Sequence, residues 1–134
     1  LFARTFCAEE FEAAGLEPLV GPTLERWFTA PYRAAHPEVV ERIGNIIRAT
    51  PVAGYVGCCH AIAALDFLDR VKAVQVPTLV LVGEQDAGTP PAMARELAAA
   101  IPGARLEIIP GAAHLSNIEQ SAIFNRLLAA FLAA

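Results

Sequence analysis

The amino-acid sequence predicts an α/β fold, in which a helical region precedes two strand–helix units of a parallel sheet. Residues 1–73 are broken by prolines into short helical stretches, whereas residues 74–134 alternate between apolar runs and helical patterns. Val76–Gly83 is a continuous apolar run rich in β-branched residues. Such a run is typical of a parallel strand that is buried on both faces. We therefore expect a helical cap region over 1–73 and a core region over 74–134.

Prolines mark three helix starts in the first region. Gly21–Thr23 precedes a short apolar stripe, Pro37 can occupy the first turn of a second helix, and Thr50–Pro51 opens a third. A proline is tolerated in a first turn because the N–H that it lacks would have no partner there. Short helices angled by prolines suit a cap better than a bundle of long helices.

The second region reads as a strand, a helix, a second strand and a last helix. Thr89 and Pro90 begin the first of these helices, and Pro102–Gly103 ends it. Leu106–Ile109 is the second predicted strand. The apolar face expected on the helix between the strands consists of Met93, Leu97 and Ile101. This order implies a parallel pair of strands with a right-handed crossover.

The last helix is expected after Ser116 and Glu119, which have the spacing of a capping box. Its expected apolar stripe is Phe124, Leu127, Leu128, Phe131 and Leu132. Two strands are too few for a stable parallel sheet. The remaining strands are therefore expected from sequence outside this chain or from a second copy of it.

Composition narrows the class of protein. Of the 134 residues, 55% are hydrophobic, and the net charge is −4. No run approaches the roughly 20 apolar residues that span a bilayer, and no basic cluster indicates nucleic acid. Nothing near Leu1 resembles a signal peptide. We expect a cytoplasmic protein that binds neither membranes nor nucleic acid, with its surplus of apolar residues in a core and a contact surface.

The cysteines show no metal or disulfide pattern. Cys58 and Cys59 are adjacent, Cys7 is distant, and the number is odd. Free thiols buried in a reducing cytosol are the expected state. The loop after Gly83 lacks the G-x-G-x-x-G spacing of a dinucleotide site. Neither a metal nor a cofactor is expected.

Two residues with acid–base chemistry follow the predicted strands. Asp86 comes after the first strand and His114 after the second. Functional groups in open α/β sheets lie just past the carboxyl ends of the strands, so adjacent parallel strands should bring these loops together. A carboxylate bonded to one ring nitrogen fixes the tautomer of a histidine and leaves the other nitrogen as a base. The order acid, then histidine, matches a hydrolase triad.

Several segments resemble the α/β-hydrolases, and more narrowly the bacterial 3-oxoadipate enol-lactonases. Val76–Asp86 and Gly111–Gln120 are similar to the C-terminal part of the superfamily. Thr23–Thr29, Ala34–Val40 and Gly54–Ala61 are similar to the lactonase cap and narrow the resemblance. The resemblance implies an incomplete α/β-hydrolase fold, with a helical cap followed by two strand–helix units of the core.

By this resemblance, Asp86 is the acid and His114 the general base of a triad that hydrolyses an enol-lactone. The product would be 3-oxoadipate, in the β-ketoadipate pathway of aromatic degradation. A serine would attack the lactone carbonyl while His114 takes its proton. Trp27 and Arg33 are candidate contacts for the small anionic substrate, since an arginine can pair with its carboxylate. Arg26 is interpreted as a solvated side chain.

The sequence contains no nucleophile in the expected place. Both serines, Ser116 and Ser121, lie after His114, whereas a hydrolase nucleophile precedes the acid on a Gly-x-Ser-x-Gly turn. Gly57–Ala61 superficially fits such a turn, but Cys59 is expected in the middle of a helix. The isolated chain is therefore expected to be inactive. The alternatives are another α/β-hydrolase, such as an esterase or haloperoxidase-like enzyme, and a non-catalytic chain that self-associates.

Overall fold

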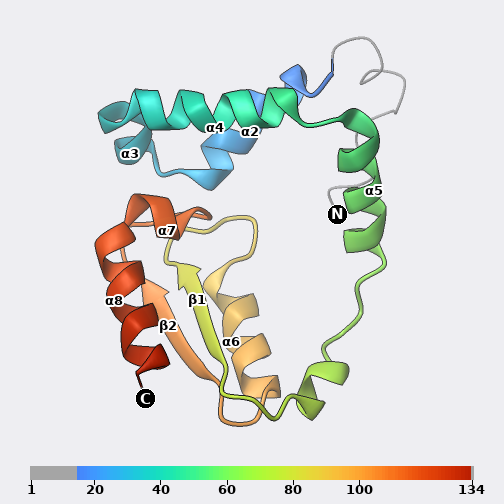
Figure 1. Ribbon diagram of the computed structural model, residues 1–134, viewed down its shortest axis with the longest axis vertical. Coiled ribbons are helices and arrows are strands. Elements are labelled where there is room, and N and C mark those ends of the chain that lie inside the picture. Colours follow the sequence, from blue (N-terminus) through green and yellow to red (C-terminus); the bar gives the residue numbers. More distant parts are fainter. Residues whose placement is uncertain (1–14, 134) are drawn as a thin grey trace. The chain divides into compact units, whose positions relative to one another are not determined.

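The computed structural model describes residues 15–133, which form two compact units (Figure 1). The helices and strands are α2 (Glu17–Trp27), α3 (Ala30–Ala35), α4 (Pro37–Ala49), α5 (Val52–Ala63), the 3-10 helix η2 (Arg70–Ala73), β1 (Leu79–Gly83), α6 (Pro91–Ala100), β2 (Arg105–Ile109), α7 (Ser116–Glu119) and α8 (Ser121–Leu132). Among the described residues, the first unit comprises 15–24 and 36–66. The second comprises 25–35 and 67–133. Helix α2 therefore begins in the first unit and ends in the second.

The first unit is helical, and a close helix contact and an ion-pair cluster both join α2 to α4. A Cβ placed on Gly44 of α4 would lie 3.3 Å from the side chain of Val20 on α2. The absence of a side chain at this position therefore lets the two helices approach closely. Near the end of α4, Arg48 donates to Glu17 and Glu41 at 2.7 and 2.8 Å, which ties α4 to the first turn of α2.

Two of the three predicted helix starts are confirmed, those at Pro37 and at Thr50–Pro51. The start predicted at Gly21–Thr23 is wrong, because α2 begins at Glu17 and continues through Pro22. Pro22 removes one N–H from the backbone ladder. Helices in proteins are stabilised mainly by packing of an apolar face, and the buried side chains on both sides of Pro22 supply that packing.

Helix α5 buries none of its residues within the part of the chain that the structure describes. Cys58 is exposed and Cys59 is half-buried, and both are free thiols. The prediction of a buried thiol is therefore wrong for Cys58, while Cys7 lies outside the described residues. An apolar sequence predicts burial only if other chain segments cover the helix, and the other helices of the first unit do not cover this one. Cys59 lies inside α5, as predicted, and not on a strand-to-helix turn.

The second unit is built on a two-stranded parallel sheet, as predicted. β1 pairs with β2 in a register that runs from Leu79 opposite Arg105 to Gly83 opposite Ile109. Helix α6 connects the strands, α8 follows β2, and each helix contacts both strands. Figure 1 shows α6 and α8 on opposite sides of the sheet. The parallel register places the loops after β1 and β2 at one edge of the sheet.

One apolar surface of the second unit is open. On the predicted apolar face of α6, Ile101 at the end of the helix is buried, but Met93 and Leu97 are 54% and 36% exposed. With residues of β1 they line a hollow of about 420 Å³. Its other apolar lining residues are Leu68, Val80, Leu81, Val82 and Ala94. The side of β1 that faces α6 thus keeps an apolar surface that the rest of the second unit does not fill.

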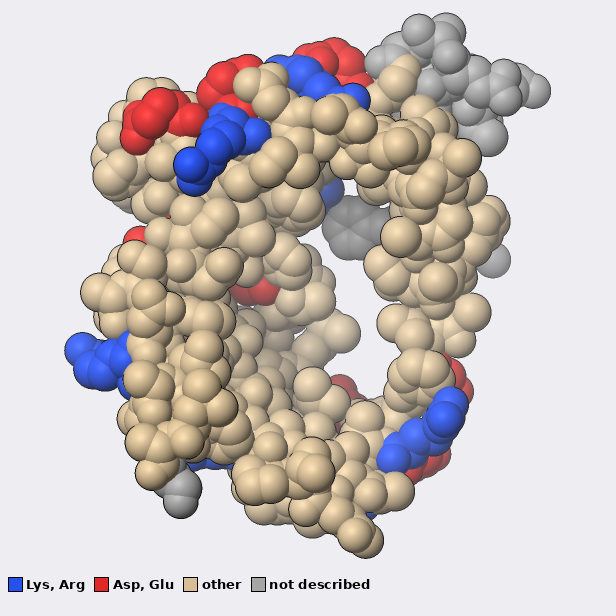
Figure 2. Space-filling view, viewed as in Figure 1, with Lys and Arg blue, Asp and Glu red and all other residues tan. Residues whose placement is uncertain are grey.

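Charged side chains of both signs are interspersed on the face of the molecule shown in Figure 2. Figure 2 shows acidic and basic side chains next to one another over α4, and no broad basic area on this face. Within residues 15–133, no single helix is long and apolar enough to cross a bilayer. Helices α4 and α5 meet the length and composition criteria only as a pair, and they are bent by 93° where they join.

Candidate active site

The loops that follow β1 and β2 are held together by hydrogen bonds. The N–H of Glu84 donates to the carbonyl of Ile109, and the N–H of Gln85 donates to the carbonyl of Ala112, both at 2.9 Å. The N–H of Gly111 donates to the carboxylate of Glu84 at 3.1 Å. The ladder between the strands therefore continues past their ends and fixes one loop against the other.

Gly83, the last residue of β1, allows the loop after β2 to come close. A Cβ at this position would lie 2.1 Å from the carbonyl oxygen of Ala113 and 2.5 Å from that of Ala112. Both obstructing atoms belong to the backbone, so they cannot turn aside as a flexible side chain would. A glycine is therefore required at position 83, because a larger residue would displace Ala113 and with it His114, the residue that follows Ala113.

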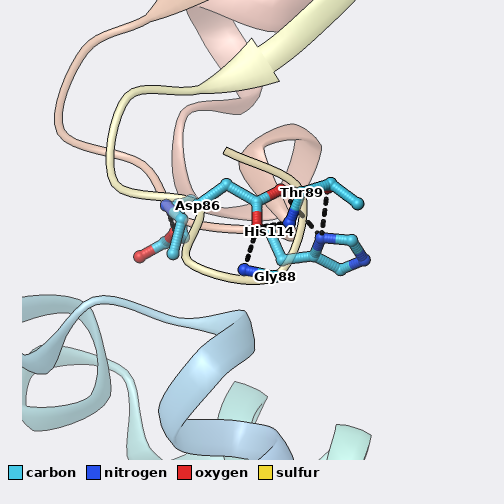
Figure 3. A network of polar contacts seen from close by, with 6 residues as sticks. Asp86, Gly88, Thr89 and His114 are labelled. Atoms are coloured by element: carbon cyan, nitrogen blue, oxygen red, sulfur yellow. Dashed lines mark hydrogen bonds and ion pairs between the residues drawn. The ribbon is translucent and has the colours of Figure 1, made fainter. Parts of the chain in front are cut away.

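Asp86 is 5% exposed, and both of its carboxylate oxygens accept hydrogen bonds. Oδ1 accepts from the backbone N–H groups of Gly88 and Thr89, each at 2.9 Å. Oδ2 accepts from the hydroxyl of Thr89 and from Nδ1 of His114, each at 2.8 Å (Figure 3). An aspartate that bonds the backbone a few residues ahead forms a self-contained turn. The local sequence thus orients the carboxylate of Asp86 independently of its hydrogen bond with His114.

The pKa of Asp86 is lowered from its ordinary value of 3.8. Burial raises the pKa, but the hydrogen bonds from the Thr89 N–H, from His114 and from the Thr89 hydroxyl lower it by more. The carboxyl group is therefore ionised at neutral pH. An ionised acceptor at Nδ1 holds the proton of the imidazole on that nitrogen, which leaves Nε2 as the basic nitrogen.

His114 is the accessible member of the pair. Its side chain is 38% exposed, compared with 4% for the side chain of Asp86. The imidazole stacks on the indole of Trp27, with ring centroids 6.0 Å apart and an angle of 24° between the planes. The structure therefore brings together three of the predicted site residues, Asp86, His114 and Trp27, in one unit.

Arg33 has a local partner at the end of α2. Its Nη1 donates to the carbonyl of Phe28 at 2.7 Å and to that of Glu25 at 3.1 Å. Arginine side chains commonly satisfy the carbonyls that a helix end leaves without partners. The structure does not bring Arg33 into a hydrogen bond with the Asp86–His114 pair, so a substrate contact by Arg33 stays a prediction. Arg26 is half-buried in the last turn of α2.

The capping box predicted for the last helix is wrong. Ser116 is buried inside the short helix α7, whose N-cap residue is Leu115, and α8 begins separately at Ser121. The carboxylate of Glu119 accepts instead from Thr29 and Ala113. A partner distant in sequence competes for this carboxylate, which a local pattern does not reveal. Of the predicted α8 stripe, only Leu132 is exposed; the others are half-buried.

Sequence reasoning missed three residues that shape the site, Gly83, Thr89 and Glu119. For Thr89 a signal was present, because Asp-x-Gly-Thr is a pattern in which the aspartate bonds the backbone ahead of it. For Gly83 and Glu119 the contacts depend on tertiary structure. Among the residues that the structure describes, no three histidine, cysteine or acidic side chains lie close enough to hold a metal ion.

The lowered pKa of Asp86 predicts how acid affects stability. A lowered pKa contributes stability that is present above the ordinary pKa of 3.8 and is lost as the pH falls through the lowered value in the folded protein. We expect the free energy of unfolding of the wild-type chain to fall more steeply below about pH 4 than that of Asp86→Asn. Urea unfolding at a series of pH values between 7 and 2 measures both slopes.

The control for this prediction is Asp69→Asn. Asp69 is an exposed aspartate that pairs with Lys72 on the surface, and exposed pairs contribute little to stability. Its acid dependence should match that of the wild-type chain. Equal slopes for the wild-type chain and Asp86→Asn would show that the hydrogen bonds to Asp86 do not stabilise its ionised form.

Comparison with known proteins relates this geometry to one fold family. Residues 12–121 match the family model of the alpha/beta hydrolase fold. The chain is 33% identical over 118 residues to 3-oxoadipate enol-lactonase 2 of Acinetobacter baylyi. The match covers 88% of this chain and 44% of that protein.

Two solved structures agree with this relationship. The enol-lactonase from Burkholderia xenovorans superimposes with a TM-score of 0.90 and 37% identity, over 95% of this chain and 48% of that one. A thermophilic esterase from Thermogutta terrifontis, with malate bound, superimposes with a TM-score of 0.87 and 31% identity, over 94% of this chain and 47% of that one. The chain thus spans about half the length of the relatives it matches. The matched residues include both strands and the loops that carry Asp86 and His114. The chain therefore belongs to the α/β-hydrolase family.

Proposed function

We propose that this chain supplies the acid and the general base of a serine-type hydrolase that opens a small anionic lactone of the 3-oxoadipate enol-lactone class. One observation carries the proposal: the 2.8 Å hydrogen bond between the buried Asp86 carboxylate and Nδ1 of the accessible His114, at the ends of two parallel strands. A buried carboxylate behind an accessible imidazole is the arrangement that general-base catalysis requires.

In the proposed reaction, Nε2 of His114 takes the proton of a serine hydroxyl while the serine oxygen attacks the lactone carbonyl. The ring C–O bond then breaks, and the imidazolium returns the proton to the departing enol oxygen. In the second half, His114 deprotonates water as the water oxygen attacks the acyl carbonyl. The bond to the serine oxygen then breaks, and the imidazolium returns the proton to that oxygen. Asp86 remains ionised and stabilises the imidazolium in both halves. The serine belongs to a part of the fold outside this chain.

Substrate selection in this proposal falls to Trp27. Its indole lies beside the imidazole and offers a flat apolar surface to a small ring. The enol-lactonases among the relatives support a lactone substrate, and the malate bound by the related esterase supports a small carboxylate ligand. Arg33 is retained as a candidate partner for that carboxylate. A place in aromatic degradation and a cytoplasmic location complete the proposal, the latter supported by the free thiols Cys58 and Cys59.

We further propose that the N-terminal part of a hydrolase core covers the open apolar surface beside β1. Met93 and Leu97 line that surface together with β1, and the relatives are about twice as long as this chain. A second copy of the chain is the alternative occupant. Gel filtration with mass detection separates the two, because a second copy would give a dimer of the isolated chain.

The test of the proposed function is a chimera in which this chain replaces the matching C-terminal part of the Burkholderia xenovorans enol-lactonase. We expect the chimera to hydrolyse 3-oxoadipate enol-lactone and His114→Ala to reduce kcat by about 10⁴-fold or more. The isolated chain should show no turnover. Product formation followed by chromatography measures all three.

A folded chimera without activity on any ester or lactone would contradict the proposal. The same assay separates the alternative of a general esterase, which the 31% identity to the thermophilic esterase favours. An esterase would turn over a simple aryl ester with a higher kcat/KM than the enol-lactone, whereas the proposed lactonase shows the reverse order.

A further inference from the structure

The carboxylate of Glu119 joins two segments that are far apart in sequence. Its Oε1 accepts the backbone N–H and the hydroxyl of Thr29, each at 2.8 Å. Its Oε2 accepts the N–H of Ala113, the residue before His114. Glu119 lies at the end of α7, so one side chain connects α7, the loop after β2 and the segment between α2 and α3.

A second link runs beside the first. The N–H of Leu115 donates to the carbonyl of Trp27 at 3.0 Å. The residues on both sides of His114 are therefore bonded, Ala113 to Glu119 and Leu115 to Trp27. Glu119 in turn binds Thr29, two residues after Trp27. The imidazole and the indole that stack on each other thus belong to two backbone segments that Glu119 and Leu115 hold together.

From this geometry we propose that Glu119 is a positioning residue for the base of the hydrolase: it holds the His114 loop against the Trp27–Thr29 segment, and so keeps the imidazole between Asp86 and Trp27. The proposal rests on the proposed function in one respect, the role of His114 as base. Hydrogen bonds to an ionised acceptor are shorter and stronger than neutral ones, which suits a side chain that fixes two backbone segments. Displacement of a reacting group by about 1 Å costs on the order of 10²-fold in rate.

The structure supplies a probe for this position in the chain itself. Trp27 is the one tryptophan of the sequence, and its indole stacks on His114. A protonated imidazole close to an indole quenches its fluorescence, so emission from the wild-type chain should rise when His114 loses its proton. This pH-dependent change reports the His114–Trp27 stack, whereas a purely structural role for Glu119 would change only the stability.

The experiment compares the pH-dependent emission of the wild-type chain with that of Glu119→Ala. We expect the pH-dependent amplitude to fall to less than about half of the wild-type value, because the two rings are no longer held together. His114→Asn should abolish the amplitude, which identifies its source. Glu119→Gln should retain an intermediate amplitude, because the amide keeps one acceptor oxygen and replaces the other with an NH₂ donor.

Glu96→Ala is the matched control. Glu96 is an exposed glutamate on α6, so its replacement makes the same change of charge without touching the two segments, and the amplitude should stay at the wild-type value. A wild-type amplitude in folded Glu119→Ala overturns the proposal. If Glu119→Ala does not fold, Thr29→Val and Glu119→Gln decide instead, since each removes part of the network; wild-type amplitudes in both overturn the proposal.

Kinetics in the chimera distinguish this proposal from the proposed function. We expect Glu119→Ala to lower kcat by about 10- to 100-fold and to raise KM by a smaller factor, since both the base and the indole of Trp27 lose their positions relative to each other. If the wild-type chimera is inactive, the proposed function fails, and the fluorescence result for Glu119 still stands on its own. If the chimera is active and Glu119→Ala leaves kcat unchanged, the positioning role fails alone.

Discussion

Replacing Gly83 by alanine is expected to cost about 3 kcal/mol or more of stability, the upper end of what overpacking costs. The new methyl carbon would have to occupy space 2.1 Å from the carbonyl oxygen of Ala113 and 2.5 Å from that of Ala112. These atoms belong to the backbone of the loop after β2. Gln85 already binds Ala112 of this loop, and Glu119 binds Ala113. Relief of the overlap must therefore displace the loop and break some of those hydrogen bonds.

The measurement is thermal unfolding of the full chain, in which Gly83→Ala should lower Tm by more than about 10 °C. Gly88→Ala is the matched control, since a Cβ at Gly88 would meet Asp86 at 3.4 Å, an ordinary contact. Its Tm should stay within a few degrees of the wild-type value. A Tm of Gly83→Ala equal to that of the control would show that the loop can move away at little cost.

The same substitution should also affect the site. Ala113 immediately precedes His114, so a shift of the loop lengthens the hydrogen bond from Nδ1 to Asp86. The downfield proton NMR signal of a strongly bonded imidazole N–H should weaken or disappear in Gly83→Ala and persist in Gly88→Ala. Stability and site geometry thus depend on one close approach between a glycine and two carbonyl groups.

The positions of Asp86 and His114 after two parallel strands, which the sequence predicted, follow from local rules. Strand β1 is an apolar β-branched run, and the helix that follows it begins after a proline, so Asp86 and His114 had to fall after parallel strands. Parallel pairing then brings the two loops to one edge of the sheet. Trp27 became a candidate in a different way, through segments that resemble the lactonase cap.

The residues that the sequence did not predict depend on contacts between distant segments. Glu119 has the spacing of a capping residue, but its carboxylate binds Thr29, a residue 90 positions away. Gly83 resembles any glycine that ends a strand until the carbonyls of Ala112 and Ala113 are in place. Cys58 was expected to be a buried free thiol, but it is exposed. Local patterns record what a segment prefers, whereas these three positions depend on what other segments do.

Asp86→Asn is expected to lower kcat of the chimera by about 10⁴-fold, the loss typical of a triad whose histidine adopts the wrong tautomer. The amide provides a single acceptor oxygen where the carboxylate accepts from two N–H groups, a hydroxyl and an imidazole. The turn N–H groups of Gly88 and Thr89 occupy that oxygen, so the amide NH₂ faces His114. An NH₂ group can only donate, which forces the proton of the imidazole onto Nε2 and removes the base.

Nitrogen NMR of the isolated chain detects this change of tautomer in Asp86→Asn without any assay of activity.

Thr89→Val tests the rest of the network, since it removes the hydroxyl donor to Asp86 but leaves the carboxylate and the Thr89 N–H in place. We expect Thr89→Val to keep the wild-type tautomer and to lose about tenfold in kcat, the scale of one hydrogen bond to a charged group. If Asp86→Asn and Thr89→Val lost activity equally, orientation by the hydroxyl would matter as much as the charge. The buried position of Asp86 favours the unequal result, because an uncharged group there cannot stabilise the imidazolium that forms when His114 accepts a proton.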